Sequence, residues 1–260
     1  MTRLIALALG SLVVDAMAGE PPQTTFTLDG LAGYEAHETR ARLSLTLDQA
    51  VDEHWHLLLG SALERLDFAD VAAGLPGTLR SAAATLGVEY RVGDDPLFAL
   101  SLQPGWYGDE NFSSGAFDMP VTLVLAYPLN DRWAVVGGLE YSRLADYLLP
   151  IIGVSADLDP HWKMDLIFPQ ATLSYQPDKQ TTAALCMELL GTGYQLSDGR
   201  RVSYCQSHAG ASWERKFHDG WSARVKAGWA FDRVFDFYQN GNRDHLGNAP
   251  FVEVGLSWKW

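Results

Sequence analysis

Histidines are the side chains of this 260-residue chain best suited to acid–base chemistry. The seven are His37, His54, His56, His161, His208, His218 and His245. A hydrolase needs a nucleophile or activated water, a histidine, and an orienting acid or amide close together. Ser207-His208 is the only adjacent Ser/His pair, and neighbours on a strand face opposite sides, so they cannot act as nucleophile and base. The sequence therefore predicts no catalytic residues.

Metal-binding patterns are equally sparse. His54-Trp55-His56 would place two imidazoles on one face of a strand, but no third ligand is evident. Several acidic groups could bind Ca²⁺ or bridge to lipopolysaccharide through divalent ions, although none has the spacing of a calcium loop. These groups are Asp67/Asp70, Asp109/Glu110 and Asp232/Asp236/Asp244. Loops are commonly acidic simply to stay solvated, so we expect no metal and no cofactor.

Cys186 and Cys205 are the only two cysteines. They fall on consecutive predicted strands, and in a hairpin centred between residues 195 and 196 they would lie opposite one another. Opposed strand residues have Cβ atoms about 4.5–5.5 Å apart, a little wider than a disulfide prefers. Their faces depend on where a bulge lies, because a slip of one residue reverses a strand. A disulfide between Cys186 and Cys205 and two buried free thiols are both compatible with the sequence.

The elements that carry these residues are strands throughout. The predicted strands are 24–34, 39–48, 54–66, 79–92, 97–107, 119–127, 132–143, 149–156, 162–175, 181–190, 201–216, 221–232 and 250–260. Many approach the nine to eleven residues of a tilted membrane strand, and short and long connections alternate along most of the chain. The number of predicted strands, thirteen, is odd, whereas a barrel with both termini on the periplasmic side needs an even number. Pro169 interrupts segment 162–175, because proline cannot donate to a sheet ladder. Either Pro169-Gln170 is a tight hairpin, giving fourteen strands, or one N-terminal strand is spurious, giving twelve. We predict an all-β, antiparallel, up-and-down transmembrane β-barrel of about twelve strands, with ten to fourteen allowed.

The last ten residues have the clearest pattern. Their alternating apolar face, which ends on an aromatic residue, is Val252, Val254, Leu256, Trp258 and Trp260. A transmembrane β-strand needs such a face because it meets lipid, with aromatics at the interface. The segment resembles the C-terminal signature that the barrel assembly machinery reads in outer-membrane proteins. We therefore predict that machinery as a partner.

Aromatic residues also gather at strand ends. The predicted girdle beside the short connections is Trp55, Tyr90, Tyr127, Trp133, Trp162, Tyr175 and Trp221. A second set beside the long loops is Trp106, Tyr107, Tyr141, Trp229 and Phe231. Two belts on opposite edges are typical of two membrane interfaces. A secreted soluble β-sandwich that acts as a binding module, a less favoured alternative, would concentrate its aromatics mid-strand.

If the apolar positions face lipid, the charged positions between them face the lumen. These are Arg40, Arg42, Glu64, Glu89, Arg91, Glu140, Lys163, Asp165, Glu188, Arg224, Lys226 and Glu253. Charges of both signs tolerate burial only when they are paired or hydrated. We predict a small passive channel or structural barrel with a mixed-charge lumen; an outer-membrane enzyme acting on lipid or lipopolysaccharide is the less favoured alternative.

Compartment and charge restrict the function further. Arg3, the apolar run Leu4 to Val14 and Ala16-Met17-Ala18 form a signal-peptide pattern. We therefore expect a signal peptide at 1–18 and one barrel domain at 19–260. The formal net charge of −13 disfavours nucleic acid as a partner, because phosphate binding needs a basic face.

Three short segments carry a family resemblance: Leu149 to Val154, Trp162 to Pro169, and Leu173 to Pro177. Through them the chain resembles an uncharacterised family of Gram-negative outer-membrane β-barrel proteins. The resemblance implies a barrel in the outer membrane, surrounded by outer-membrane lipid and lipopolysaccharide. It implies no established activity and no catalytic residues.

Overall fold

The computed structural model describes residues 24–35, 37–69, 72, 74–92, 95–109, 114–238 and 241–259. The predicted signal peptide and Trp260 lie outside these residues. None of the described segments is a helix with the length and hydropathy needed to cross a bilayer.

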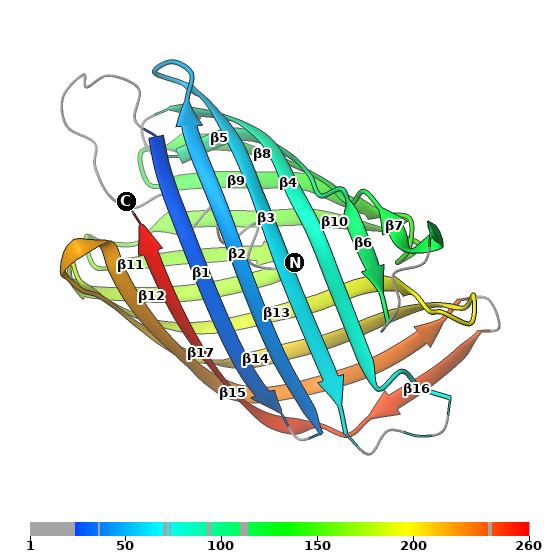
Figure 1. Cartoon of the computed structure of the whole chain (residues 1–260). Helices are drawn as coiled ribbons and strands as arrows, with labels where there is room; N and C mark the ends of the chain where they lie inside the picture. Colours follow the sequence, from blue (N-terminus) through cyan, green and yellow to red (C-terminus); the bar gives the residue numbers. More distant parts are fainter. Residues whose placement is uncertain are drawn as a thin grey trace.

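The described residues form one antiparallel barrel of seventeen strand segments (Figure 1). The first half comprises β1 (Thr24–Glu35), β2 (Glu38–Ala50), β3 (Trp55–Phe68), β4 (Thr78–Val92), β5 (Asp95–Leu102), β6 (Gly105–Gly108), β7 (Phe117–Asp118), β8 (Val121–Asn130) and β9 (Trp133–Ser142). The second half comprises β10 (Tyr147–Asp157), β11 (Trp162–Phe168), β12 (Gln170–Asp178), β13 (Thr181–Gln195), β14 (Arg201–Lys216), β15 (Trp221–Phe237), β16 (Asn242–Leu246) and β17 (Ala249–Lys259). Two short 3₁₀ turns, η1 (Ser114–Ala116) and η2 (His218–Gly220), complete the described elements. Pairing of β1 with both β2 and β17 closes the barrel.

The barrel wall has fourteen strands, since three of them are interrupted. β6 continues β5 along the edge of β4, β7 leads into β8, and β16 leads into β17. Our preference for twelve strands is therefore wrong, and the alternative of fourteen holds. The even number arises from the tight turn at Pro169, which splits segment 162–175 into the short hairpin of β11 and β12.

We call the end with the short connections, such as residues 51–54, 131–132 and 158–161, the short-turn end. The opposite end is the long-loop end. In outer-membrane barrels these two ends face the periplasm and the exterior, respectively.

The outer face of the wall is apolar. Side chains alternate along each strand, and the outward set exposes large hydrophobic residues around the barrel, among them Leu43, Leu63, Ile152, Leu185 and Val254. Such a surface would be unstable in water and suits lipid. The structure is a closed barrel, so the alternative of a soluble β-sandwich is wrong.

The inward and outward side chains of β14 alternate without interruption along the strand. The sequence alone left open which of its residues face the lumen. Val202, Tyr204, Gln206 and His208 are all buried on the inward face. The register shift with β15 lies between Cys205 and Ser207, and it is accommodated on β15, where Asp232 has a φ of 51°. The two apolar residues thus point into the barrel and not to lipid.

The two cysteines are free, and the expectation that they oppose one another is wrong. Cys186 lies opposite Gly210, and Cys205 lies opposite Gly191. The turn of the hairpin spans residues 196–200, so its centre is later in the chain than the symmetric estimate places it.

Candidate functional site: the barrel lumen

Three short turns share one local structure, which places a tryptophan at the start of the next strand. The side-chain oxygen of Asp52 accepts hydrogen bonds from the backbone N–H groups of His54 and Trp55, at 2.8 and 2.7 Å. Asn130 does the same for Arg132 and Trp133, and Asp159 for His161 and Trp162. These are Asx turns, in which a short polar side chain replaces a backbone acceptor. At Asp52 the two hydrogen bonds lower the pKa of the carboxyl group.

The predicted girdle residues lie together at the short-turn end. Trp55 pairs in register with Tyr90, Trp162 with Tyr175, and Trp221 with Trp258. Tyr127 and Trp133 flank the turn between β8 and β9 and are exposed. In the C-terminal strand, Val252, Val254 and Leu256 are exposed on the outer face, and the ring of Trp258 stacks on that of Trp221 at 5.6 Å.

Inside the barrel, a cluster of ionic groups lies near the short-turn end. His56 Nδ1 is 2.8 Å from Asp48 Oδ1. Arg91 is 3.0 Å from Asp48 Oδ2 and donates to Glu89 at 2.8 Å. The two predicted lumen residues, Glu89 and Arg91, therefore pair with each other and hold the other two groups in place.

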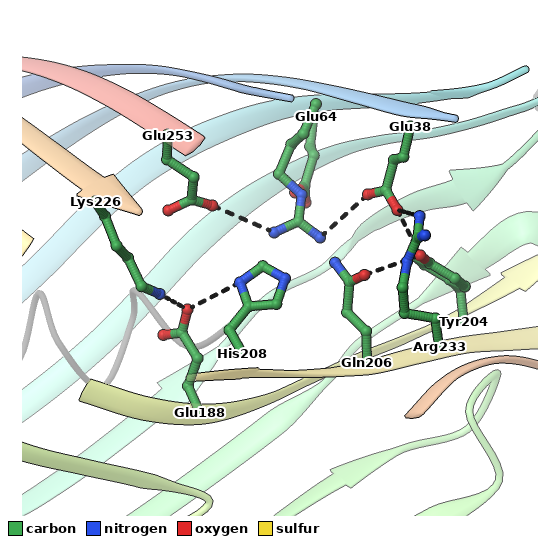
Figure 2. A network of polar contacts seen from close by, with 10 residues as sticks. Glu38, Glu64, Glu188, Tyr204, Gln206, His208, Lys226, Arg233 and Glu253 are labelled. Atoms are coloured by element: carbon green, nitrogen blue, oxygen red, sulfur yellow. Dashed lines mark hydrogen bonds and ion pairs between the residues drawn. The ribbon is translucent and has the colours of Figure 1, made fainter. Parts of the chain in front are cut away.

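A second network, whose carboxylates Glu38, Glu64 and Glu253 are labelled in Figure 2, lies deeper, toward the long-loop end. Arg40 joins these three carboxylates. Its guanidinium group is 3.5 Å from Glu64 and 3.9 Å from both Glu253 and Glu38. Glu38 in turn is 3.1 Å from Arg233. The hydroxyl of Tyr204 donates to Glu38 and lies 2.9 Å from Gln206.

The third group joins β13, β14 and β15. Lys226 donates to Glu188, which also lies 3.5 Å from His208 Nδ1. The imidazole of His208 stacks on Phe251 at 4.2 Å, and the Lys226 ammonium group is 5.3 Å from the same ring. These contacts distribute the buried charge among several partners, as burial requires.

The other predicted lumen residues are less tightly enclosed, except for Glu140. That carboxylate is buried and accepts a hydrogen bond from Tyr147 at 3.1 Å. Asp165 accepts one from Ser155 at 2.5 Å. Arg42, Lys163 and Arg224 are partly buried, at inward positions of their strands.

Exposure differs between two of the lumenal contacts. Near the short-turn end the side chains of His56 and Asp48 are 20% and 22% exposed. Deeper in the barrel those of Arg233 and Glu38 are only 2% and 1% exposed. Solvent therefore reaches the contact between His56 and Asp48 and is nearly excluded from the one between Arg233 and Glu38.

An apolar cluster fills the lumen at the long-loop end, and the sequence did not predict it. Its buried residues are Leu66, Phe68, Leu79, Tyr107, Leu144, Tyr194, Leu196, Val202, Tyr204, Phe235 and Phe237. Phe68, Tyr204 and Phe235 form a triad with ring centroids 4.8–5.0 Å apart. Tyr107, which the sequence suggested for the second aromatic belt, is buried in this cluster. We call these eleven residues the mouth cluster.

The tip of the β13–β14 hairpin holds the mouth cluster in place. β12 pairs with β13 only as far as Glu188, and beyond it β13 reaches across the barrel to β6, where Gln195 pairs with Gly108 (Figure 1). Ser197 donates from its backbone and its hydroxyl to Asp109, each at 2.8 Å. Arg200 donates to the carbonyl of Gly74 at 3.0 Å. The hairpin thus closes the long-loop mouth.

The histidines considered for chemistry have other contacts in the structure. No group of three or more His, Cys, Asp or Glu side chains among the described residues is arranged to hold a metal ion. His54 stacks on Tyr90, and His56 belongs to the ionic cluster near the short-turn end. His208 points inward, so its neighbour Ser207 is on the opposite face of β14.

No protein-family model and no curated protein matches the chain. Among solved structures it is similar to the COG4313 outer membrane channel from Pseudomonas putida F1, with a TM-score of 0.53 at 15% identity over 95% of this chain and 100% of that one. The TodX monoaromatic hydrocarbon channel mutant overlaps less well, with a TM-score of 0.44 at 11% identity over 93% of this chain and 91% of that one. The KdgM porin has a TM-score of 0.39 at 11% identity over 89% of this chain and 98% of that one. The first similarity confirms that the chain has the fold of Gram-negative outer-membrane β-barrel proteins.

Proposed function

We propose that the protein is an outer-membrane channel for small polar solutes, closed at its long-loop mouth in this structure. The observation that carries the proposal is the lumen itself. Charged side chains of both signs extend from the short-turn end to the mouth cluster, and they are arranged as ion pairs and not as a solid apolar core. Such a lining suits hydrated solutes once the mouth opens.

The mouth cluster explains how a channel with this lumen can be closed. Its aromatic and aliphatic side chains meet across the barrel and exclude water, and hydrophobic constrictions are one way in which channels gate. The closing element is a hairpin tip that has left the wall. Moving it would leave the closed ring of wall strands intact.

The architecture also makes the alternative of an inert structural barrel testable. We would replace residues 192–204 by an Asn-Gly turn, which joins Gly191 to its register partner Cys205 and suits a two-residue hairpin. Planar-bilayer recordings should show a small, infrequent conductance for the wild-type protein and a larger, persistent one for the shortened variant. Arg243→Gln, an exposed change in β16 outside the hairpin, is the control.

The proposal would be overturned if the shortened barrel stayed silent. Its incorporation into the bilayer and its heat-modifiable migration on a gel must first show that it is folded. Under those conditions a silent barrel would have a lumen blocked along its length, and the structural alternative would hold.

A further inference from the structure

Two arginines face outward at the long-loop edge of the apolar surface. Arg65 on β3 and Arg80 on β4 are directly opposite in the register. Both share the outward phase of their strands, because the neighbours Leu66 and Leu79 point into the mouth cluster. They are therefore on the lipid side of the wall and not in the lumen.

The residues around this pair define its place relative to lipid. The next row of outward-facing residues, on the short-turn side of the arginines, runs across five strands. It consists of Leu43, Leu63, Ala82, Trp106 and Phe117. The rings of Trp106 and Phe117 pack edge to face at 5.6 Å, as in an interfacial aromatic belt. In the row of the arginines, the flanking residues are Ala41 and Gly108, whose small side chains cannot cover the guanidinium groups. The pair thus lies directly beyond the lipid-facing band.

Of the two arginines, Arg80 is the one without a carboxylate partner among the described residues. Like charges directly opposite on neighbouring strands destabilise a sheet. Asp67 accepts two hydrogen bonds from Arg65, at 2.6 and 2.8 Å, and one from Thr78 at 2.7 Å. Arg80 has no hydrogen bond or 4 Å ion pair with any described residue, and its Nε is buried without a partner. Asp67 is thus already engaged by Arg65 and Thr78, and Arg80 is left without a carboxylate among the described residues.

An anion that reaches this position from the membrane would give the guanidinium group of Arg80 a partner of opposite charge. A phosphate group can accept paired N–H donors from arginine, a bidentate geometry that lysine does not offer. The long-loop end of an outer-membrane barrel faces the outer leaflet. We propose that Arg65 and Arg80 bind a phosphate of a phosphorylated glycolipid of that leaflet, such as lipopolysaccharide. Its acyl chains lie along Leu63, Trp106 and Phe117.

Two other exposed arginines of this end differ from the pair. Arg243 is bonded to Asp236 at 2.7 Å, and Arg200 to Asp198 at 2.7 Å. Each has its own carboxylate and lies in a loop or in β16 beyond the wall. They provide matched controls for a general effect of positive charge.

The test is a lipid-binding measurement on the purified, folded barrel in detergent, by native mass spectrometry. The probes are a bisphosphorylated lipid A, the same lipid with both phosphates removed, and inorganic phosphate. We expect the wild-type protein to bind the phosphorylated lipid at least tenfold more tightly than the dephosphorylated one. Arg65→Gln/Arg80→Gln should lose most of that preference, whereas Arg243→Gln should keep it.

Inorganic phosphate at equal concentration should not compete, because it lacks the acyl chains that place the lipid against the wall. Equal binding of the two lipids by the wild-type protein would overturn the proposal without any variant. So would an unchanged preference in the double variant, and competition by inorganic phosphate would show a simple anion site. None of these results depends on whether the barrel conducts.

Discussion

A β-carbon on Gly193 would lie only 2.1 Å from the backbone nitrogen of Ala145. The hairpin that closes the mouth and the connection between β9 and β10 therefore meet backbone to backbone. Two residues earlier, the carbonyl of Gly191 accepts a hydrogen bond from the hydroxyl of Tyr147 at 3.4 Å. No strand separates β10 from β13 beyond the short β11–β12 hairpin. The absence of a side chain at Gly193 therefore allows the β13–β14 hairpin to pack directly against the β9–β10 connection.

Gly193→Ala should accordingly disturb the closed mouth. A methyl group there cannot be accommodated by a side-chain rotation, because the atoms it meets are backbone atoms. We expect a higher open probability in planar-bilayer recordings, with the barrel still folded. The matched control is Gly137→Ala on β9, where an added β-carbon meets nothing within 4 Å. Equal open probabilities for Gly193→Ala and Gly137→Ala would contradict the role of this backbone contact in closing the mouth.

The buried pair of Glu188 and Lys226 should be sensitive to the loss of one partner. Glu188→Leu leaves the Lys226 ammonium group buried without its carboxylate, and breaking such pairs typically costs about 3–5 kcal/mol. The double variant Glu188→Leu/Lys226→Met removes both charges, so we expect it to recover most of that free energy of unfolding. Urea unfolding followed by tryptophan fluorescence measures both. Additive losses in the double variant would show that the two side chains are not coupled.

Much of the outer surface could be predicted from the sequence, because lipid imposes a strict rule on it. Every second residue of a wall strand must be apolar, so Val252, Val254 and Leu256 could be assigned to the outer face from alternation alone. The Asx turns likewise mark strand starts locally, as Asp52 and Asn130 do. These features depend on near neighbours in the chain, which a single sequence displays.

The mouth cluster could not be predicted, because the same rule fails there. Val202 and Tyr204 are apolar and point inward, and the alternation pattern assigns such residues to lipid. The sequence held one indication of this inward position. Val202 and Tyr204 lie on the same face of the strand as the polar residues Gln206 and His208, which would be unfavourable in lipid. Their inward position belongs with the crossing of β13 to β6, and this contact joins Gln195 to Gly108, far away in the chain.

The cysteines should remain reduced for a geometric reason. Gly210, the register partner of Cys186, is five residues from Cys205 along β14, about 17 Å at the rise of an extended strand. A disulfide needs Cα atoms roughly 4.4–6.8 Å apart. Thiol titration of the unreduced, denatured protein should therefore find two free thiols. Loss of both thiols in a monomeric sample would contradict the register.

Acid should weaken one turn and leave its neutral counterpart unaffected. Asp52 has a lowered pKa because it accepts the N–H groups of Trp55 and His54. A carboxyl group with a lowered folded pKa stabilises the fold above its unfolded pKa, about 3.9, and loses that contribution as the pH falls through the folded value. Asn130 makes the same two contacts without titrating. Asp52→Asn should thus reduce the acid sensitivity of unfolding, and Asn130→Asp should increase it. Urea midpoints measured between pH 6 and pH 2.5 compare the variants with the wild-type protein, and parallel curves for all three would refute the assignment.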